Sequence, residues 1–281
     1  MFIVHTVSEL RQLLQLAHRQ KKTIGLVPTM GALHAGHLSL VQACKAQCAL
    51  TVTSIFVNPT QFNNPEDLRN YPRTLKDDST LLQANGVDIL FAPCEKEIYP
   101  EPDTRSFDFG TLERVMEGKY RPGHFNGVAQ VVSRLFSIVQ PGYAFFGEKD
   151  FQQLAIIRAL VTQLDEQPVI VGCPIVRESD GLAMSSRNRL LSETQRKQAP
   201  LIAATLMQAK EKAPALPVEE LKKWVAATIN ANSELEVEYI EIAGEKNLQP
   251  IKQWSDATHA RLFAAVYARP VRLIDNIRLS E

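Results

Sequence analysis

Short apolar segments alternate with helical ones through the first two-thirds of this 281-residue chain, and this order limits the folds that it can adopt. Strands joined by helices form βαβ units, in which the strands lie parallel and ligands bind beyond their carboxyl ends. The sequence therefore predicts an α/β fold built on a parallel sheet. The expected strands are residues 23–28, 50–57, 87–92, 143–146 and 168–172, and the expected helices follow Thr6 and cover 36–48, 75–83, 128–139 and 151–163.

A different pattern begins near residue 175. Asp180 and Gly181 between short apolar segments indicate a tight hairpin turn. Helices followed by mostly antiparallel strands predict a smaller α+β domain, so we expect domains at residues 1–175 and 176–281. Its expected helices are residues 193–212 and 218–230, and its expected strands are residues 236–242, 260–268 and 271–278.

Composition argues against several classes of function. Lys plus Arg and Asp plus Glu both number 31, and neither part of the chain has the basic excess that is typical of nucleic-acid binders. No apolar run approaches the ~20 residues of a membrane span, and the N-terminus lacks the charged start of a secretion signal. We therefore expect a cytoplasmic protein that binds neither nucleic acid nor membranes.

The spacing of the four cysteines indicates that they pack in the fold and do not bind a metal or react. Cys44 and Cys48 are one helical turn apart, and the other two are Cys94 and Cys173. No second Cys pair or His follows at the spacing of a zinc site. This pattern favours reduced thiols over the alternative, a metal or redox role.

The segment PTMGALHAGH, residues 28–37, follows an expected strand and opens an expected helix. Its glycines let the backbone approach a ligand, and the helix N-terminus offers N–H groups and a positive dipole end to phosphate. His34 and His37 are close enough to donate to the same charged group. A Gly-rich turn with two surface histidines is the alternative, but the position between strand and helix favours nucleotide binding.

Two later segments carry cations that suit phosphate. FFGEKDFQQ, residues 145–153, again lies between a strand and a helix and contains Lys149. VRESDGLAMSSRN, residues 176–188, combines serine hydroxyls with Arg187, and such a loop can close over pyrophosphate as a lid. Solvated surface and a polar interdomain linker are the ordinary alternatives.

Two further loops offer groups for a small polar substrate. FVNPTQFN, residues 56–63, contains the amides of Asn58 and Gln61, which suit a substrate with hydroxyl and carboxylate groups. YRPGHFNGV, residues 120–128, adds Arg121 at the start of a helix. Each is ambiguous alone, because amides and helix caps are common in loops.

Together these segments closely resemble the pantoate–β-alanine ligase (pantothenate synthetase) family. The matching strings are PTMGALHAGHLSLV, FVNPTQF, YPRTL, RPGHFNGV, FFGEKDFQQL and DGLAMSSRN, in this order from residue 28 to 188, and the resemblance covers essentially the whole chain. HAGH is similar to the nucleotide signature of the wider nucleotidyl-transferring superfamily. MSSR resembles its second signature, which more often ends in Lys.

The resemblance implies a Rossmann-like N-terminal domain, a smaller C-terminal lid domain and a homodimer. It implies a reaction in which ATP, with Mg²⁺, drives the condensation of (R)-pantoate with β-alanine. The reaction would pass through an enzyme-bound pantoyl adenylate and release AMP and pyrophosphate, as a step of coenzyme A precursor synthesis.

The resemblance also implies roles for individual residues. His37 matches a proton donor, and the catalytic set is His34, His37, Lys149 and Arg187. Pantoate and β-alanine would contact Asn58, Gln61, Arg121, His124 and Gln153. Asp77 and Asp78 correspond to acidic residues near the metal and pyrophosphate, although Asp pairs on helix surfaces are common. ATP would contact Met30, Gly31, Ala32, Leu33, His34, Ala35, Gly36, His37, Gly147, Glu148, Lys149, Asp150, Val176, Met184, Ser185, Ser186 and Arg187. Asn126 departs from the Arg that is more usual in the family.

Three other functions are compatible with parts of this pattern. A nucleotidyltransferase could adenylate a different small acid or phosphate ester, but the loop around Gln61 argues against it. An RNA-dependent synthetase-like module would need a basic surface, which the charge-neutral C-terminal part lacks. A non-catalytic nucleotide sensor is disfavoured because every candidate catalytic group is present.

Overall fold

The computed structural model describes residues 1–165 and 168–279, which form two compact units. The first consists of Met1–Phe109, Arg121–Glu148 and Gln153–Pro174. The second consists of Gly110–Tyr120, Lys149–Gln152 and the chain from Ile175 onward. The domain division at residue 175 stays a prediction. The two units differ from it by grouping residues 110–120 and 149–152 with the C-terminal part.

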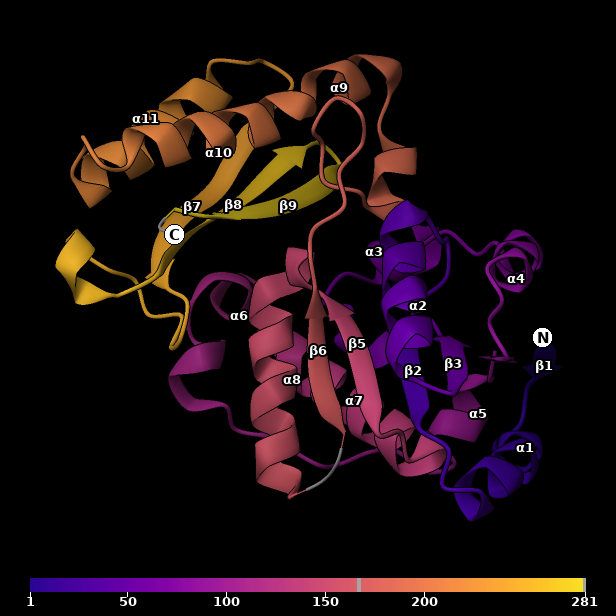
Figure 1. Ribbon diagram of the computed structural model, residues 1–281. Coiled ribbons are helices and arrows are strands. Elements are labelled where there is room, and N and C mark those ends of the chain that lie inside the picture. The colour runs from indigo at the N-terminus through magenta and orange to yellow at the C-terminus, as the bar shows by residue number, and fades with distance from the viewer. Residues whose placement is uncertain (166–167, 280–281) are drawn as a thin grey trace. The chain divides into compact units, whose positions relative to one another are not determined.

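A six-stranded parallel sheet forms the centre of the first unit (Figure 1). Its order is β1-β4-β3-β2-β5-β6. From β2 the chain adds β3 and then β4 on one side, and it later adds β5 and β6 on the other side, where β5 pairs with β2. This is a Rossmann-like order, and ligands bind such sheets where the direction switches, here at the carboxyl ends of β2 and β5. The strands are β1 (Phe2–Val4), β2 (Ile24–Thr29), β3 (Leu50–Ile55), β4 (Ile89–Phe91), β5 (Tyr143–Gly147) and β6 (Val169–Cys173).

Helices cover both faces of this sheet. Leu26 and Val27 point to opposite faces of β2, yet neither is exposed to solvent. The parallel sheet with its helices confirms the predicted fold class. The helices that lie wholly or mostly in this unit are α1 (Val7–Arg19), α2 (Ala35–Gln47), α3 (Pro65–Asn70), α4 (Leu75–Ala84), α5 (Glu95–Ile98), α7 (His124–Val139) and α8 (Phe151–Leu164).

The start of α1 shows how local sequence sets an element boundary. Thr6 Oγ1 accepts a hydrogen bond from the N–H of Glu9 at 3.2 Å, and Glu9 Oε2 accepts one from the N–H of Thr6 at 3.0 Å. This capping box satisfies two N–H groups that a helix otherwise leaves unpaired. The helix predicted to follow Thr6 is therefore confirmed.

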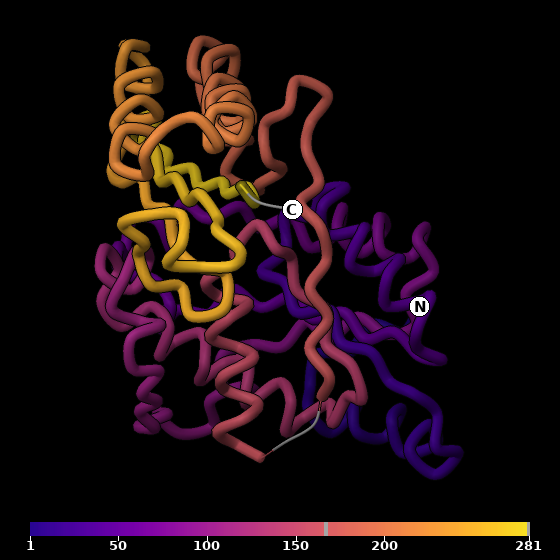
Figure 2. Tube along the Cα trace, turned by 60° about the vertical axis from the view of Figure 1, so that its left-hand side comes forward, coloured from indigo at the N-terminus to yellow at the C-terminus, as the bar shows by residue number. Residues whose placement is uncertain are grey.

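The second unit contains an antiparallel sheet of β7 (Glu236–Gly244), β8 (Ala260–Ala268) and β9 (Val271–Arg278). Two long helices, α10 (Pro200–Lys212) and α11 (Val218–Asn230), run along one face of it (Figures 1 and 2). Their apolar sides meet the sheet in a core that includes Leu206, Val225 and Leu262. The segment grouped with them contains α6 (Met116–Tyr120). The smaller α+β arrangement is as predicted.

One expected helix is divided in two. Residues 193–212 were predicted as a single helix, but α9 (Glu193–Gln198) ends before α10 begins at Pro200. Proline has no N–H to donate and its ring clashes with the preceding turn, whereas the first position of a helix tolerates both features. Pro200 therefore starts a new helix, and the prediction of one continuous helix was wrong.

None of the helices in the two described ranges has the length and apolarity that a membrane span requires.

The cysteines differ sharply in their surroundings, which predicts their reactivity. Cys44 on α2 is fully buried against β2, where a Cβ on Gly25 would lie 2.2 Å from its sulfur, and burial raises the pKa of its thiol to about 12. Cys94 is exposed. Because the thiolate is the reacting form, we expect iodoacetamide at pH 8 to label Cys94 in the native protein and Cys44 only after unfolding. Mass spectrometry of the peptides would measure this, and equal labelling rates would contradict it.

Candidate active site

The loop between β2 and α2 lies at the switch point of the parallel sheet. Its backbone is left-handed at Gly31 and Ala32, with φ of +82° and +50°. A left-handed alanine is unfavourable by about 1–2 kcal/mol, so neighbouring groups must hold this shape. Asp78 on α4 provides them: its two carboxylate oxygens accept the N–H groups of Ala32 and Leu33 at 2.9 and 2.8 Å. The side chain is buried, so these bonds are shielded from water.

His34 and His37 lie side by side at the start of α2. Their ring centroids are 4.1 Å apart. Nδ1 of His34 accepts the N–H of Gly36 at 3.1 Å, and Nδ1 of His37 accepts the N–H of His34 at 3.3 Å. A neutral imidazole that accepts at Nδ1 carries its proton on Nε2. The loop therefore sets both rings to donate from Nε2, beside a helix N-terminus that favours anions.

The loop after β3 brings two predicted substrate-binding amides to the nucleotide loop. Gln61 Nε2 lies 3.1 Å from Met30 Sδ, and Asn58 Nδ2 lies 3.3 Å from Gln61 Oε1. Asn58 is buried, and its Nδ2 also donates to the carbonyl of Gly127 at 3.0 Å. These contacts fix the position of Gln61 beside the loop that carries the two histidines.

Arg121 and His124 complete this cluster from the start of α7. His124 Nδ1 lies 2.9 Å from the carbonyl oxygen of Gln61, to which it donates, and Arg121 Nη2 donates to the same oxygen at 3.4 Å. Arg121 Nη1 lies 3.3 Å from His124 Nε2. The structure thus brings together four residues that the resemblance assigned to substrate binding, namely Asn58, Gln61, Arg121 and His124.

The end of β5 holds the first part of the second predicted nucleotide segment. β5 pairs in parallel with β2 and ends at Gly147, so Gly147 and Glu148 lie at the same edge of the sheet as the histidine loop. Gln153 is the third residue of α8 and is half-buried. These three residues belong to the first unit.

Lys149 and Asp150 belong to the second unit. Lys149 Nζ is 3.9 Å from Asp150 Oδ1, and the Lys149 side chain is 19% exposed. The partly buried ammonium is held on a short turn between β5 and α8. Such a cation can act on phosphate as a point charge.

The predicted lid segment is a short hairpin followed by a turn of helix. Its base pairs Arg177 with Ala183 in an antiparallel bridge, and the N–H of Met184 donates to the carbonyl of Val176 at 3.0 Å. The predicted hairpin turn is therefore present. After it, Ser185 Oγ accepts the N–H of Arg187 at 3.3 Å, while Ser186 is buried.

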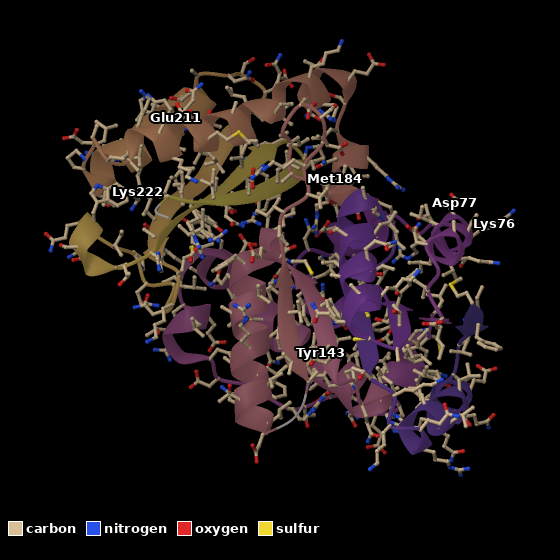
Figure 3. All side chains as sticks on the ribbon, viewed as in Figure 1. Lys76, Asp77, Tyr143, Met184, Glu211 and Lys222 are labelled. Atoms are coloured by element: carbon tan, nitrogen blue, oxygen red, sulfur yellow. The ribbon has the colours of Figure 1, made fainter. Side chains whose placement is uncertain are left out.

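The two aspartates predicted to lie near the metal have different surroundings in the structure. Both oxygens of Asp78 accept backbone N–H groups, and Thr74 Oγ1 lies 3.1 Å from Oδ2. Asp77 is exposed on α4 beside Lys76 (Figure 3). Within the part of the chain that the structure describes, no three His, Cys, Asp or Glu side chains come together as a possible metal-binding group. The metal role of Asp77 and Asp78 stays a prediction, and the contacts of Asp78 show a structural role for its carboxylate.

Comparison with known proteins identifies the family. A family model described as Pantoate-beta-alanine ligase matches residues 2–278. The chain belongs to the pantoate–β-alanine ligase family. Among curated relatives, a pantothenate synthetase of Porphyromonas gingivalis is 52% identical over 281 residues, all of both chains. One of Phocaeicola vulgatus is 53% identical over 279 residues, 99% of both.

Solved structures agree with the assignment to the pantoate–β-alanine ligases. Pantothenate synthetase from Thermus thermophilus has a TM-score of 0.94 and 44% identity over all of both chains. Pantoate-β-alanine ligase from Francisella tularensis, complexed with β-γ ATP and β-alanine, has a TM-score of 0.84 and 37% identity, covering 99% of this chain and 98% of that one. This protein is therefore a ligase, an enzyme that forms a C–N bond.

Asn126, where the resemblance leads us to expect Arg, has a structural role in this protein. Its Oδ1 accepts the N–H of Phe107 at 2.9 Å, and its Nδ2 donates to the carbonyl of Arg105 at 3.5 Å. The amide thus holds the segment that follows α5. A guanidinium offers only donors and could not replace the first of these bonds.

Sequence reasoning missed two residues that shape this ligase's Gln61 loop. Tyr99 donates to Asn58 Oδ1 at 3.0 Å from a position 41 residues away. Gly127 packs so closely that a Cβ there would lie 2.4 Å from the carbonyl oxygen of Thr60. The RPGHFNGV string contained Gly127, but only the fold shows what it contacts. Nothing in the sequence signals the contact of Tyr99.

Proposed function

We propose that this protein catalyses the ATP-dependent condensation of (R)-pantoate with β-alanine to pantothenate, through a pantoyl adenylate, with release of AMP and pyrophosphate. Family membership supports pantothenate formation. The observation that carries the adenylate step is the pair of imidazoles, set to donate from Nε2 at a helix N-terminus on the switch point of a Rossmann-like sheet.

The chemistry requires activation because a carboxylate is a poor electrophile. The carboxylate oxygen of pantoate attacks the α-phosphorus of ATP, a P–O bond forms, and the bond to pyrophosphate breaks. Negative charge grows on the α-phosphate and on the departing pyrophosphate, so fixed donors and cations lower the barrier. His34, His37 and the N-terminus of α2 would supply the donors, and the Met30–Leu33 backbone and Gly36 would line the nucleotide.

The second unit would contribute the cations. We propose that Lys149 binds phosphate, that Asp150 binds the ribose, and that Val176 and Met184 to Arg187 complete the ATP site. Arg187 on the lid segment can bind two phosphate oxygens at once. Closure of this segment would keep water from the adenylate.

Pantoate would bind at the cluster around Gln61, together with Gln153. Gln61 and Arg121 offer amide and guanidinium donors that match its hydroxyls and carboxylate. The buried Asn58 would contribute by holding Gln61 in place. The neutral amine of β-alanine would then attack the carbonyl carbon of the adenylate. The new C–N bond forms, AMP leaves with the electron pair of the C–O bond, and the amine loses a proton.

Mg²⁺ belongs to this proposal as part of the nucleotide. Proteins often bind Mg²⁺ through one or two carboxylates and the phosphates of the substrate. Because Asp78 is engaged by backbone N–H groups, we propose that the ion arrives on the phosphates of ATP. The homodimer and the cytoplasmic location stay predictions from the resemblance and the sequence.

ATP–pyrophosphate exchange tests this function directly. The purified protein is given ATP and labelled pyrophosphate, with and without pantoate, and β-alanine is left out. We expect exchange that requires pantoate, followed by pantothenate when β-alanine is added. Binding of ATP without pantoate-dependent exchange would contradict the adenylate, and exchange with a different acid would indicate another adenylating enzyme.

Gly127→Ala should affect the pantoate site selectively. Its Cβ would collide with the backbone of Thr60 and Gln61, at 2.4 and 2.8 Å, so the Gln61 loop must shift. Misplacement by an ångström is costly, so we expect the KM for pantoate to rise about tenfold or more while the KM for ATP stays unchanged. Gly142→Ala is the matched control, because its nearest neighbour would be 3.7 Å away. Equal kinetics for the two variants would contradict this account.

A further inference from the structure

Two adjacent polar residues, Asp275 and Asn276, are buried in β9, with 5% and 2% of their surfaces exposed. β9 is an edge strand of the small sheet, and it contributes Val271 and Leu273 to the apolar core of the second unit. Burying a carboxylate and an amide is unfavourable unless both are fully hydrogen-bonded. Their partners therefore indicate why polar groups occupy these positions.

Asp275 holds the base of the lid segment. Its Oδ2 and Oδ1 accept Nη1 and Nη2 of Arg177 at 2.7 and 3.0 Å, a bidentate pair. Arg177 Nη1 also donates to the carbonyl of Gly181 across the hairpin at 3.1 Å. The carboxylate thus ties both ends of the hairpin turn to the sheet.

Asn276 holds the segment that carries Lys149. Its Nδ2 donates to the carbonyl oxygen of Lys149 at 2.9 Å, and its Oδ1 accepts from Arg261 Nη1. Arg261 is itself fixed, because it pairs with Glu245 at 2.7 Å and its guanidinium lies 4.0 Å from the ring centroid of Phe151. The amide can therefore neither rotate nor withdraw without breaking several contacts.

We propose that Asp275 and Asn276 are positioning residues, which hold the lid segment and Lys149 at a fixed separation so that both meet the phosphates of ATP. This inference rests on the proposed function. Asp275 and Asn276 are adjacent in β9, and successive residues of a strand rise by about 3.3 Å. The lid segment and the segment with Lys149 are therefore anchored at neighbouring positions of one strand. Neither residue is proposed to touch substrate; they would act through Lys149 and Arg187, whose charges stabilise the transition state only if held in place beforehand.

Asn276→Asp is the first test, because it keeps the shape but removes the donor to Lys149. We expect the KM for ATP in pantoate-dependent exchange to rise, and kcat to fall, by about ten- to a hundredfold. The KM for pantoate should not change. If Asn276 had only a structural role, the variant would yield less folded enzyme, and the KM values for ATP and for pantoate would not respond differently.

Asp275→Asn is the second test, because it keeps the shape but removes the charge that pairs with Arg177. The assay contains pantoate and ATP without β-alanine. We expect the variant to release more pyrophosphate than wild-type protein for each adenylate that stays bound, because a loosened lid admits water that hydrolyses the adenylate. Ile242→Val, a fully buried change on β7 of the same sheet, is the control; it should lower the melting temperature and leave both KM values unchanged.

The outcomes separate this inference from the proposed function. If wild-type protein exchanges pyrophosphate and both variants behave like Ile242→Val, the positioning role is wrong. If wild-type protein shows no exchange, the proposed function fails, and calorimetric titration with ATP alone decides the inference. Weaker ATP binding by Asn276→Asp than by Ile242→Val would then support it, and equal binding would overturn it.

Discussion

Replacing His37 by alanine is expected to lower the rate of pantoate-dependent ATP–pyrophosphate exchange by about 10²–10³-fold, the effect of losing one preorganised donor, or roughly 3–4 kcal/mol. The ring accepts the N–H of His34 at Nδ1, so its proton lies on Nε2 and the donor is oriented before ATP binds. Lys149→Ala should have an effect of similar size, because a fixed cation is lost. The measurement is exchange at saturating pantoate.

Two amide variants separate the roles of the two ring nitrogens of His37, because each amide mimics one of them. His37→Asn keeps an acceptor near Nδ1 and should preserve stability while exchange stays as slow as in the alanine variant. His37→Gln keeps a donor near Nε2 and should recover part of the rate. His18→Ala, an exposed histidine in the last turn of α1, should leave exchange unchanged. Near-wild-type turnover by His37→Ala would show that this ring is not the donor.

Local signals were sufficient for the elements that create the switch point. The strand before residue 28, the glycines after it and the helix from about residue 36 all follow from short-range preferences, and the structure has β2 and α2 there. The expected parallel sheet also follows, because strands separated by helices have few other solutions. The histidine pair could thus be placed at a carboxyl strand end from sequence alone.

Elements that depend on distant contacts could not be predicted in the same way. β1 has only three residues, and two of them, Phe2 and Ile3, are exposed. Its pairing with β4, which is 87 positions away, identifies it as a strand. The short helices α3, α5 and α6 are likewise too brief to show a helical period. The grouping of residues 110–120 with the C-terminal part is invisible to any local pattern.

In the candidate site, too, local sequence predicted the types of the residues but not the distant groups that they contact. The motifs identified which side chains carry charge and which loops they occupy. They did not reveal that Asp78 binds N–H groups 45 and 46 positions away, because adjacent aspartates near a helix start look alike in sequence. Resemblance suggested metal binding for both, whereas the geometry favours a structural role for one.

Asp78→Asn should therefore destabilise the protein and disable its nucleotide loop. The amide keeps one oxygen, so its NH₂ group must face the N–H of Ala32 or Leu33, and that N–H loses the carboxylate oxygen to which it now donates. We expect the free energy of unfolding to fall by about 1.5–3 kcal/mol, the range for a hydrogen bond to a charged group. The left-handed backbone at Ala32 then loses its support, and exchange should slow through a higher KM for ATP. Urea unfolding and exchange kinetics measure the two effects.

The neighbouring Asp77→Asn makes this a comparison between two chemically identical changes. Asp77 is exposed, so its variant should change stability by no more than about 0.5 kcal/mol and leave exchange intact. If both aspartates instead bound the metal, both variants would need more Mg²⁺ for half-maximal exchange and neither would lose much stability. A stability loss confined to Asp78→Asn, with an unchanged Mg²⁺ requirement, would mean that α4 holds the nucleotide loop and that the ion is bound elsewhere, on the phosphates of ATP.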